Sequence, residues 1–425
     1  MSVGEYRLEN LPNGQRLVTE KLDHLRSVCL GFWIPAGSRD EPARLEGATH
    51  FLEHLLFKGS SKYTAEEVAQ VFDTLGGELN ASTSREYVVV YGRFLDDQLP
   101  TALDVMADML ITPTFADLDR EREVILEEIA MVEDSPQDLI HDVLAEVVLD
   151  GHALAHPILG TVQTITEASE EEIRGYHQQR FQFSDMVVAA AGNVSHDELR
   201  ELLLERQPAS TGTEPQRAAS QPVSKPCRQF VEKETEQMHV CLGGVGLARD
   251  DDRRYQLSVL DSLFGGSLSS RLFQEIREKR GLVYSVYSFS SLYQETGLTG
   301  LYFGCRPERL EPVMETVGRE LQRLVKEPVP ADELQRAKEH LKGRLILGLE
   351  STSSRMTRLG KGVLTNTEIL SLDELASRIE AVTPEQLLEL ASQLYRPERL
   401  SVVGIGSDRS QFESVVPVDC LAALA

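Results

Sequence analysis

Val28-Cys29-Leu30-Gly31 recurs in the second half of the chain as Val240-Cys241-Leu242-Gly243. Both stretches are short and apolar, which predicts two strands. Each stretch leads through a polar turn, at residues 38–41 or 249–252, into a helical pattern. Because the same succession of elements occurs twice, the sequence predicts a duplicated unit.

A second correspondence lies near the end of each half. The apolar residues 186–193 are matched by residues 400–407, and each run follows a predicted helix, at about 172–183 and 384–395. The correspondence therefore persists through the whole unit. We expect an α+β fold with two homologous domains of duplicated origin, each a mostly antiparallel sheet packed with helices.

The boundary between the halves is predicted at residues 207–227. This segment lacks hydrophobic periodicity and is rich in Pro, Ser, Thr and Gly, as linkers are. A chain of 425 residues is also too long for one ordinary core and fits two domains of about 200 residues. The predicted domains are residues 1–206 and 228–425.

The composition excludes several classes of protein. With 41% hydrophobic and 26% charged residues, the chain has the composition of a soluble globular protein. No apolar run approaches the roughly 18 residues that cross a bilayer. A net charge of −25 disfavours nucleic acid and anionic membranes, so we expect neither as a partner. The acidic surface suits basic peptides or serves solubility alone.

The cysteines and the amino terminus indicate the cellular compartment. The 5 cysteines are widely spaced and form no C-x-x-C pair, which favours reduced thiols over disulfides or a thiolate metal site. Residues 1–8 show neither a secretory signal nor an arginine-rich presequence. We expect a cytoplasmic, bacterial protein.

The motif His50-Phe51-Leu52-Glu53-His54 carries the chemistry of the chain. On a helix, histidines four residues apart share one face, and the glutamate falls beside them. Two neutral imidazoles suit a zinc ion, and an unligated carboxylate nearby can take a proton from water. This is the H-x-x-E-H order of the inverzincins. The alternative is an accidental pair of exposed helical histidines.

A catalytic zinc ion needs a third protein ligand, and the helical pattern after residue 118 offers one. Glu121 and Glu128 fall within its apolar stripe, whereas Glu123 and Glu127 point away. Buried carboxylates are costly unless they are paired or bind a metal. Glu128 is the predicted ligand, with Glu127 as the fallback. The stripe consists of Leu118, Val124, Ile125, Ile129 and Val132.

Glu121 is predicted to accept a hydrogen bond from a ligating imidazole, because it lies one double turn before Glu128. The alternative is structural: the two buried glutamates would pair with arginines such as Arg122 or Arg93.

In its His pair and distal glutamate the chain resembles the pitrilysin/insulinase family of zinc metallopeptidases. The resemblance spans essentially the whole chain and includes residues 76–83, 133–136 and 156–160. The length is that of half-sized members, similar to the β subunit of mitochondrial processing peptidase and its bacterial relatives. The resemblance implies one zinc ion per chain, held by His50, His54 and Glu128, with Glu53 as general base.

The resemblance also assigns residues in the second half, which has no His pair of its own. Family members carry an arginine and a tyrosine seven residues apart that bind substrate and help to stabilise the oxyanion. Arg277 and Tyr284 match those positions, with Arg280 as the alternative arginine. Asn80 and Ala81 match an edge strand that pairs with the substrate backbone. Without the resemblance, Asn80 could equally be an ordinary turn residue.

We therefore expect a zinc-dependent endopeptidase acting on extended or unfolded peptides. Half-sized relatives usually dimerise, which implies a homodimer here, with a heterodimer of related chains as the alternative. The competing hypothesis is a non-catalytic structural or partner subunit of a peptidase of the same family. The sequence disfavours it, because the zinc motif and the Arg–Tyr pair are both intact.

Overall fold

The computed structural model describes residues 6–206, 217, 220–223 and 225–416. These residues form two compact units, each built from several segments of the chain. Unit 1 comprises Met1–Ala130, His156–Ala218 and Ile346–Ser371, and unit 2 comprises Met131–Ala155, Ala219–Leu345 and Leu372–Ala425. Over the described part of the chain, no helix is long and apolar enough to cross a membrane.

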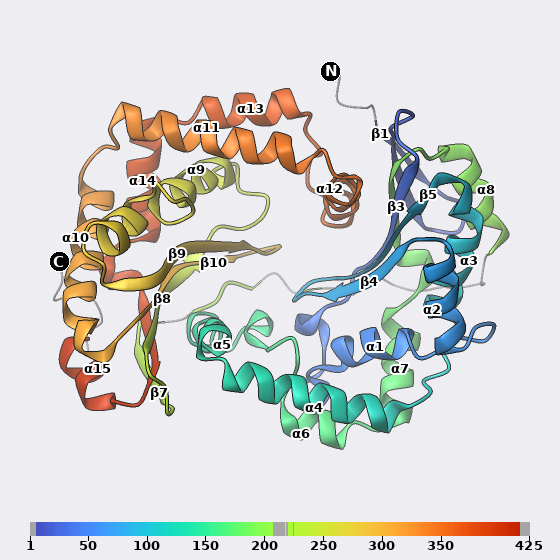
Figure 1. The fold of residues 1–425 in the computed structure, drawn as a ribbon, viewed down its shortest axis with the longest axis horizontal. Helices are drawn as coiled ribbons and strands as arrows, with labels where there is room; N and C mark the ends of the chain where they lie inside the picture. The colour runs from blue at the N-terminus through green and yellow to red at the C-terminus, as the bar shows by residue number, and fades with distance from the viewer. Residues whose placement is uncertain (1–5, 207–216, 218–219, 224, 417–425) are drawn as a thin grey trace. The chain divides into compact units, whose positions relative to one another are not determined.

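Unit 1 contains a six-stranded sheet in the order β1-β2-β6-β3-β5-β4. Figure 1 labels four of its strands, β1, β3, β4 and β5. Only the pair β2–β6 is parallel, and the other neighbours are antiparallel. The strands are β1 (Tyr6–Asn10), β2 (Arg16–Lys21), β3 (Ser27–Ile34), β4 (Glu78–Thr83), β5 (Val88–Leu95) and β6 (Val187–Gly192).

Unit 2 contains a five-stranded sheet in the order β7-β11-β8-β10-β9. Here too a single pair, β7–β11, is parallel. The strands are β7 (Arg228–Glu232), β8 (Met238–Gly246), β9 (Val283–Leu292), β10 (Gly297–Cys305) and β11 (Ser401–Gly406).

The two sheets share one topology, which confirms the predicted α+β fold of duplicated origin. Strands β2, β6, β3, β5 and β4 of unit 1 correspond in order and direction to β7, β11, β8, β10 and β9 of unit 2. The repeated Val-Cys-Leu-Gly stretches lie in the equivalent strands β3 and β8. Unit 1 adds β1 at its edge.

Strands β3, β6, β10 and β11 are buried along almost their whole length because both faces of each sheet are covered. In unit 1 one face packs against helices α1, α2, α3, α4, α7 and α8, through residues such as Phe51, Phe72 and Ile125. The helices are α1 (Ala48–Leu56), α2 (Ala65–Thr74), α3 (Leu99–Ile111), α4 (Leu118–Asp134), α6 (Val162–Glu167), α7 (Glu170–Arg180) and α8 (His196–Glu205).

The second half of the chain supplies the helix on the other face of the unit 1 sheet. Helix α12 (Thr352–Leu364) contacts β2, β3 and β6, and Figure 1 shows it beside β3. Its Met356 sulfur accepts a hydrogen bond from the buried indole of Trp33, at 3.3 Å. Arg355 of the same helix pairs with the buried Glu20 on β2. The unit 1 core therefore includes residues from both halves of the sequence.

Unit 2 shows the reciprocal arrangement. Helix α5 (Pro136–Val148), from the first half of the chain, packs against β8 and β11 through residues such as Leu144. The opposite face packs against α9, α10 and α14. Besides α5, the helices of unit 2 are α9 (Arg254–Phe264), α10 (Leu310–Lys326), α11 (Ala331–Gly348), α13 (Leu372–Glu380), α14 (Pro384–Leu394) and α15 (Arg409–Val415).

The compact units thus differ from the predicted halves, residues 1–206 and 228–425. Each unit takes one helical segment from the other half, residues 131–155 and 346–371. Each segment belongs to one half in sequence but buries its apolar face on the sheet formed by the other half. Much of the predicted linker, residues 207–227, lies outside the described residues.

Candidate metal centre

The His motif lies on α1, whose first turn is fixed by two features. Gly47 precedes the helix with φ of 91°, a left-handed conformation that favours glycine. A Cβ there would also lie 2.5 Å from the carbonyl oxygen of Leu159. The carboxylate of the buried Glu41 then accepts hydrogen bonds from the backbone N–H groups of Gly47 and Thr49, both at 2.7 Å. These contacts satisfy donors that a helix start leaves unpaired.

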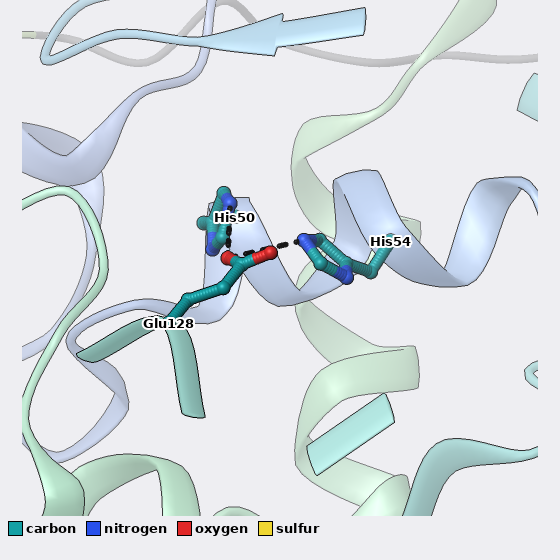
Figure 2. A group of neighbouring side chains, drawn as sticks. All are labelled: His50, His54 and Glu128. Carbon is teal, nitrogen blue, oxygen red and sulfur yellow. Dashed lines mark ion pairs between the residues drawn. The ribbon is translucent and has the colours of Figure 1, made fainter. Parts of the chain in front are cut away.

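His50 and His54 lie on successive turns of α1, and Glu128 reaches between them from α4 (Figure 2). One carboxylate oxygen of Glu128, Oε2, lies 3.6 Å from Nε2 of His50 and 3.6 Å from Nε2 of His54. One donor atom from each residue can be chosen so that all three lie within 4.8 Å of one another. All three side chains are partly buried.

This geometry fits a zinc ion. Ligands about 2 Å from zinc in a tetrahedral site lie roughly 3.4 Å from one another, close to the separations between Glu128 and the imidazoles. Two imidazoles and one carboxylate are also a donor set of catalytic zinc sites, which keep the fourth position open. The three residues would hold the ion, and Glu53 lies outside this group.

His50 has the protonation state that a ligand needs. Burial, together with the neighbouring His54, lowers the pKa of His50 to about 4. Its imidazole is therefore neutral near pH 7 and can offer a lone pair to a metal. Within the described residues, Nδ1 of His50 is buried without a hydrogen-bond partner.

The phase of α4 separates Glu128 from the fallback ligand Glu127. Glu123 and Glu127 are exposed, as predicted, whereas Glu121 is buried and Glu128 partly buried. The prediction for Val124 was wrong, because this residue is 40% exposed and does not join the buried stripe. At 100° per residue Val124 lies at the margin of the stripe, where the packing of α4 does not bury it.

Glu121 supports His54 from α4. Its Oε2 lies 3.3 Å from Nδ1 of His54, and its Oε1 lies 2.8 Å from Nζ of Lys58. A carboxylate in this place orients the ring, because the imidazole donates from Nδ1 while Nε2 faces the metal position. Lys58 balances the charge of the buried carboxylate.

The alternative, in which Glu121 and Glu128 pair with Arg122 or Arg93, is not adopted. Arg122 donates to the backbone carbonyls of Ile165 and Ala168, and Arg93 pairs with Glu78. Glu121 and Glu128 instead face the histidines of α1.

Glu53 turns toward strand β4. The hydroxyl of Thr83, the last residue of that strand, donates a hydrogen bond to Oε2 of Glu53. Burial raises the pKa of Glu53 above its ordinary value, and the hydrogen bond from the Thr83 side chain opposes the rise. A carboxylate with a raised pKa, beside the metal position, is suited to accept a proton from water.

Strand β4 forms one of the two edges of the unit 1 sheet, with β5 as its one neighbour among the described strands. Asn80 is exposed within this strand, and its side-chain oxygen accepts a hydrogen bond from the N–H of Ala81 at 2.8 Å. The strand begins at Glu78, so Asn80 and Ala81 lie inside it. A cavity of about 280 Å³ adjoins it, lined by Glu53, His54, Phe57, Lys58, Asn80 and Glu121.

Arg277 and Tyr284 belong to unit 2, apart from the residues of the His motif in sequence and unit. They contact each other, with the guanidinium carbon 5.0 Å from the centre of the phenol ring. Tyr284 is 79% exposed at the start of β9, so its hydroxyl is accessible. Arg280, the alternative, instead bonds to the carboxylate and backbone of Glu275.

Three residues around the motif escaped the sequence analysis: Glu41, Lys58 and Thr83. Thr83 lies 30 residues from Glu53, so no local period connects the two. Glu41 lies before the start of α1, so the periodicity of that helix does not include it. Two signals were available. Lys58 lies four residues after His54, and Thr83 shares a strand face with Ala81.

Family models match both halves of the chain. The model described as insulinase (peptidase family M16) matches residues 16–162, which include the His motif. The model described as the peptidase M16 inactive domain matches residues 167–341.

Bacterial proteins of similar length align with nearly the whole chain. An uncharacterized zinc protease of Streptomyces coelicolor is 43% identical over 96% of this chain and 91% of its own. An uncharacterized zinc protease of Bacillus subtilis is 40% identical over 90% of this chain and 94% of its own.

Solved structures share the fold. A protease from Helicobacter pylori superposes with a TM-score of 0.88 at 21% identity, covering 95% of this chain and all of the other. A peptidase M16 inactive domain from Pseudomonas fluorescens gives the same TM-score at 22% identity, covering 95% and 98%. At this identity the likeness concerns the fold.

Proposed function

The chain belongs to the insulinase family of M16 peptidases, and from this premise we propose that it is a zinc-dependent endopeptidase of extended or unfolded peptides. One observation carries the proposal: His50, His54 and Glu128 converge on one point, with Glu53 beside them but outside the donor group. Three ligands, an open position and a free carboxylate are the parts that hydrolysis by a catalytic zinc ion requires.

Zinc, when bound, supplies a Lewis acid and lowers the pKa of water toward ~7. Glu53 takes the proton of the attacking water and delivers it to the nitrogen of the leaving amine. Glu121 keeps the ring of His54 oriented through Nδ1. In this proposal, Glu128 binds zinc and Glu53 transfers the proton, so the two tasks belong to different carboxylates.

The proposed substrate site is the free edge of β4. An extended peptide can add to an exposed sheet edge through backbone hydrogen bonds, which demand little of its side chains. We assign this pairing to Asn80 and Ala81, which lie on the edge strand. Arg277 and Tyr284 are proposed to bind substrate and to help stabilise the oxyanion, because a guanidinium and a phenol are hydrogen-bond donors for developing negative charge.

Removal of the metal tests the proposed activity. We expect the purified chain to contain one zinc ion and to cleave members of a mixed peptide library. A chelator should abolish cleavage, and zinc added in slight excess should restore it. Zinc content and cleavage products are measured on the same samples. A chain that binds zinc but cleaves no peptide would support the alternative, a partner subunit without turnover.

A homodimer is the proposed assembly, with a heterodimer of related chains as the alternative. The basis is the resemblance to half-sized family members. Size-exclusion chromatography with light scattering should give twice the chain mass of 47.4 kDa. A fully active monomer would refute the homodimer. A bacterial cytoplasmic location is likewise our proposal, and the bacterial origin of the relatives supports the bacterial part of it.

A further inference from the structure

The carboxylate of Glu53, the proposed general base, accepts a hydrogen bond from Thr83, a residue outside the metal-binding group. Glu53 lies between the two histidines on α1, and its carboxylate turns to the end of β4. There the Thr83 hydroxyl donates to Oε2 of Glu53, and the side chain of Thr83 is half-buried. The contact joins the helix of the His motif to the edge strand of the same unit.

One hydrogen bond of this kind restricts a long side chain. A glutamate has three rotatable side-chain bonds, so a carboxylate without a partner samples several positions. With Oε2 bonded to Thr83, the second oxygen, Oε1, is the one that we assign to accept the proton. A base must lie within hydrogen-bond reach of the proton that it removes, so this restriction bears on the rate of proton transfer.

The partner residue lies on the strand proposed to hold the substrate. Ala81 and Thr83 are two residues apart on β4 and therefore face the same side, roughly 7 Å apart along the strand. The same short segment of β4 would thus position both a peptide paired with this edge and the carboxylate of Glu53.

We propose that Thr83 is a positioning residue that fixes the carboxylate of Glu53 relative to a peptide on strand β4. The inference rests on the proposed function. The water oxygen bonds to the scissile carbonyl carbon while one water proton passes to Oε1 of Glu53. That proton then moves to the amide nitrogen as the C–N bond breaks. Thr83 keeps its own proton throughout and donates to Oε2.

Two substitutions at one position test the role. Thr83→Val keeps the shape and removes the hydroxyl, and Thr83→Ser keeps the hydroxyl and removes the methyl group. We expect Thr83→Val to lower kcat by about 10- to 100-fold, with KM and zinc affinity changed less than about twofold. Thr83→Ser should recover most of the lost rate. Equal kcat values for Thr83→Val and the parent chain would overturn the proposal.

A matched control separates positioning from general destabilisation. Thr64 also donates its hydroxyl to a carboxylate, that of Glu67 at 3.0 Å, at the start of α2. Thr64→Val therefore removes the same kind of bond elsewhere in unit 1, together with the cap that the hydroxyl provides for the N–H of Glu67. The kcat of this variant should stay at the parent value. If Thr83→Ser is as slow as Thr83→Val, or if Thr83→Val loses zinc, the role is structural and the proposal fails.

A second measurement does not depend on activity. Thr83→Val, Glu53→Ala and the double variant are unfolded with urea after removal of zinc, completing a double-mutant cycle. Two groups in contact should give non-additive effects, with a coupling of at least about fivefold in the unfolding equilibrium constant. Additive effects would overturn the contact itself. Coupling in a chain that cleaves no peptide would retain the contact and reject the proposed function.

Discussion

Glu53→Gln is expected to retain zinc and to lose peptide cleavage. Glutamine has the shape of glutamate but cannot accept a proton as a base at neutral pH, so the water attack loses its proton acceptor. We expect kcat/KM to fall by roughly 10²- to 10⁴-fold, the range that general acid–base catalysis contributes. Zinc content should stay near that of the parent chain, because Glu53 is not among the three converging donors.

The measurement pairs zinc analysis with cleavage of a fluorogenic peptide selected from the library. Glu123→Gln serves as the control, because it makes the same chemical change at an exposed position of α4. This control should match the parent chain in both readouts. Activity retained in Glu53→Gln would contradict the proposed mechanism, whereas loss of zinc from it would place Glu53 among the ligands.

Glu128→Gln is expected to lose both zinc and activity. The substitution replaces a charged ligand by a neutral amide at the point where the imidazoles converge. Substitution of residues that merely support metal ligands costs 10- to 100-fold in affinity or activity, so loss of a direct ligand should weaken zinc binding by at least about 100-fold. Competition with a chromogenic chelator measures this change.

Thermal unfolding gives a second readout of the same variant. A ligand that binds the folded chain raises its stability, so chelation should lower the Tm of the parent chain. Glu128→Gln should show little response to the chelator. Glu127→Gln is the matched control, since Glu127 is adjacent in sequence but exposed, and it should bind zinc as the parent chain does. Reversal of these two results would identify Glu127 as the ligand.

Much of the fold followed from local patterns. The repeated apolar stretches became the equivalent strands β3 and β8, and the helices predicted at about 172–183 and 384–395 correspond to α7 and α14. Periodicity reports these elements because burial on a sheet or against a helix repeats with the geometry of the backbone. It does not report which sheet a helix covers, so the exchange of α5 and α12 between the units was not predicted.

The sequence alone determined the parts of the site that lie on a single helix. The spacing of His50 and His54 places them on one face, and the phase of α4 distinguishes Glu128 from Glu127, because helical geometry fixes the angle between residues. Only the tertiary structure decided that Glu128 meets both imidazoles, that Lys58 pairs with Glu121, and that Thr83 holds Glu53. Most of these contacts join elements far apart in the chain. Their distances depend on how α1, α4 and β4 pack, which no local period encodes.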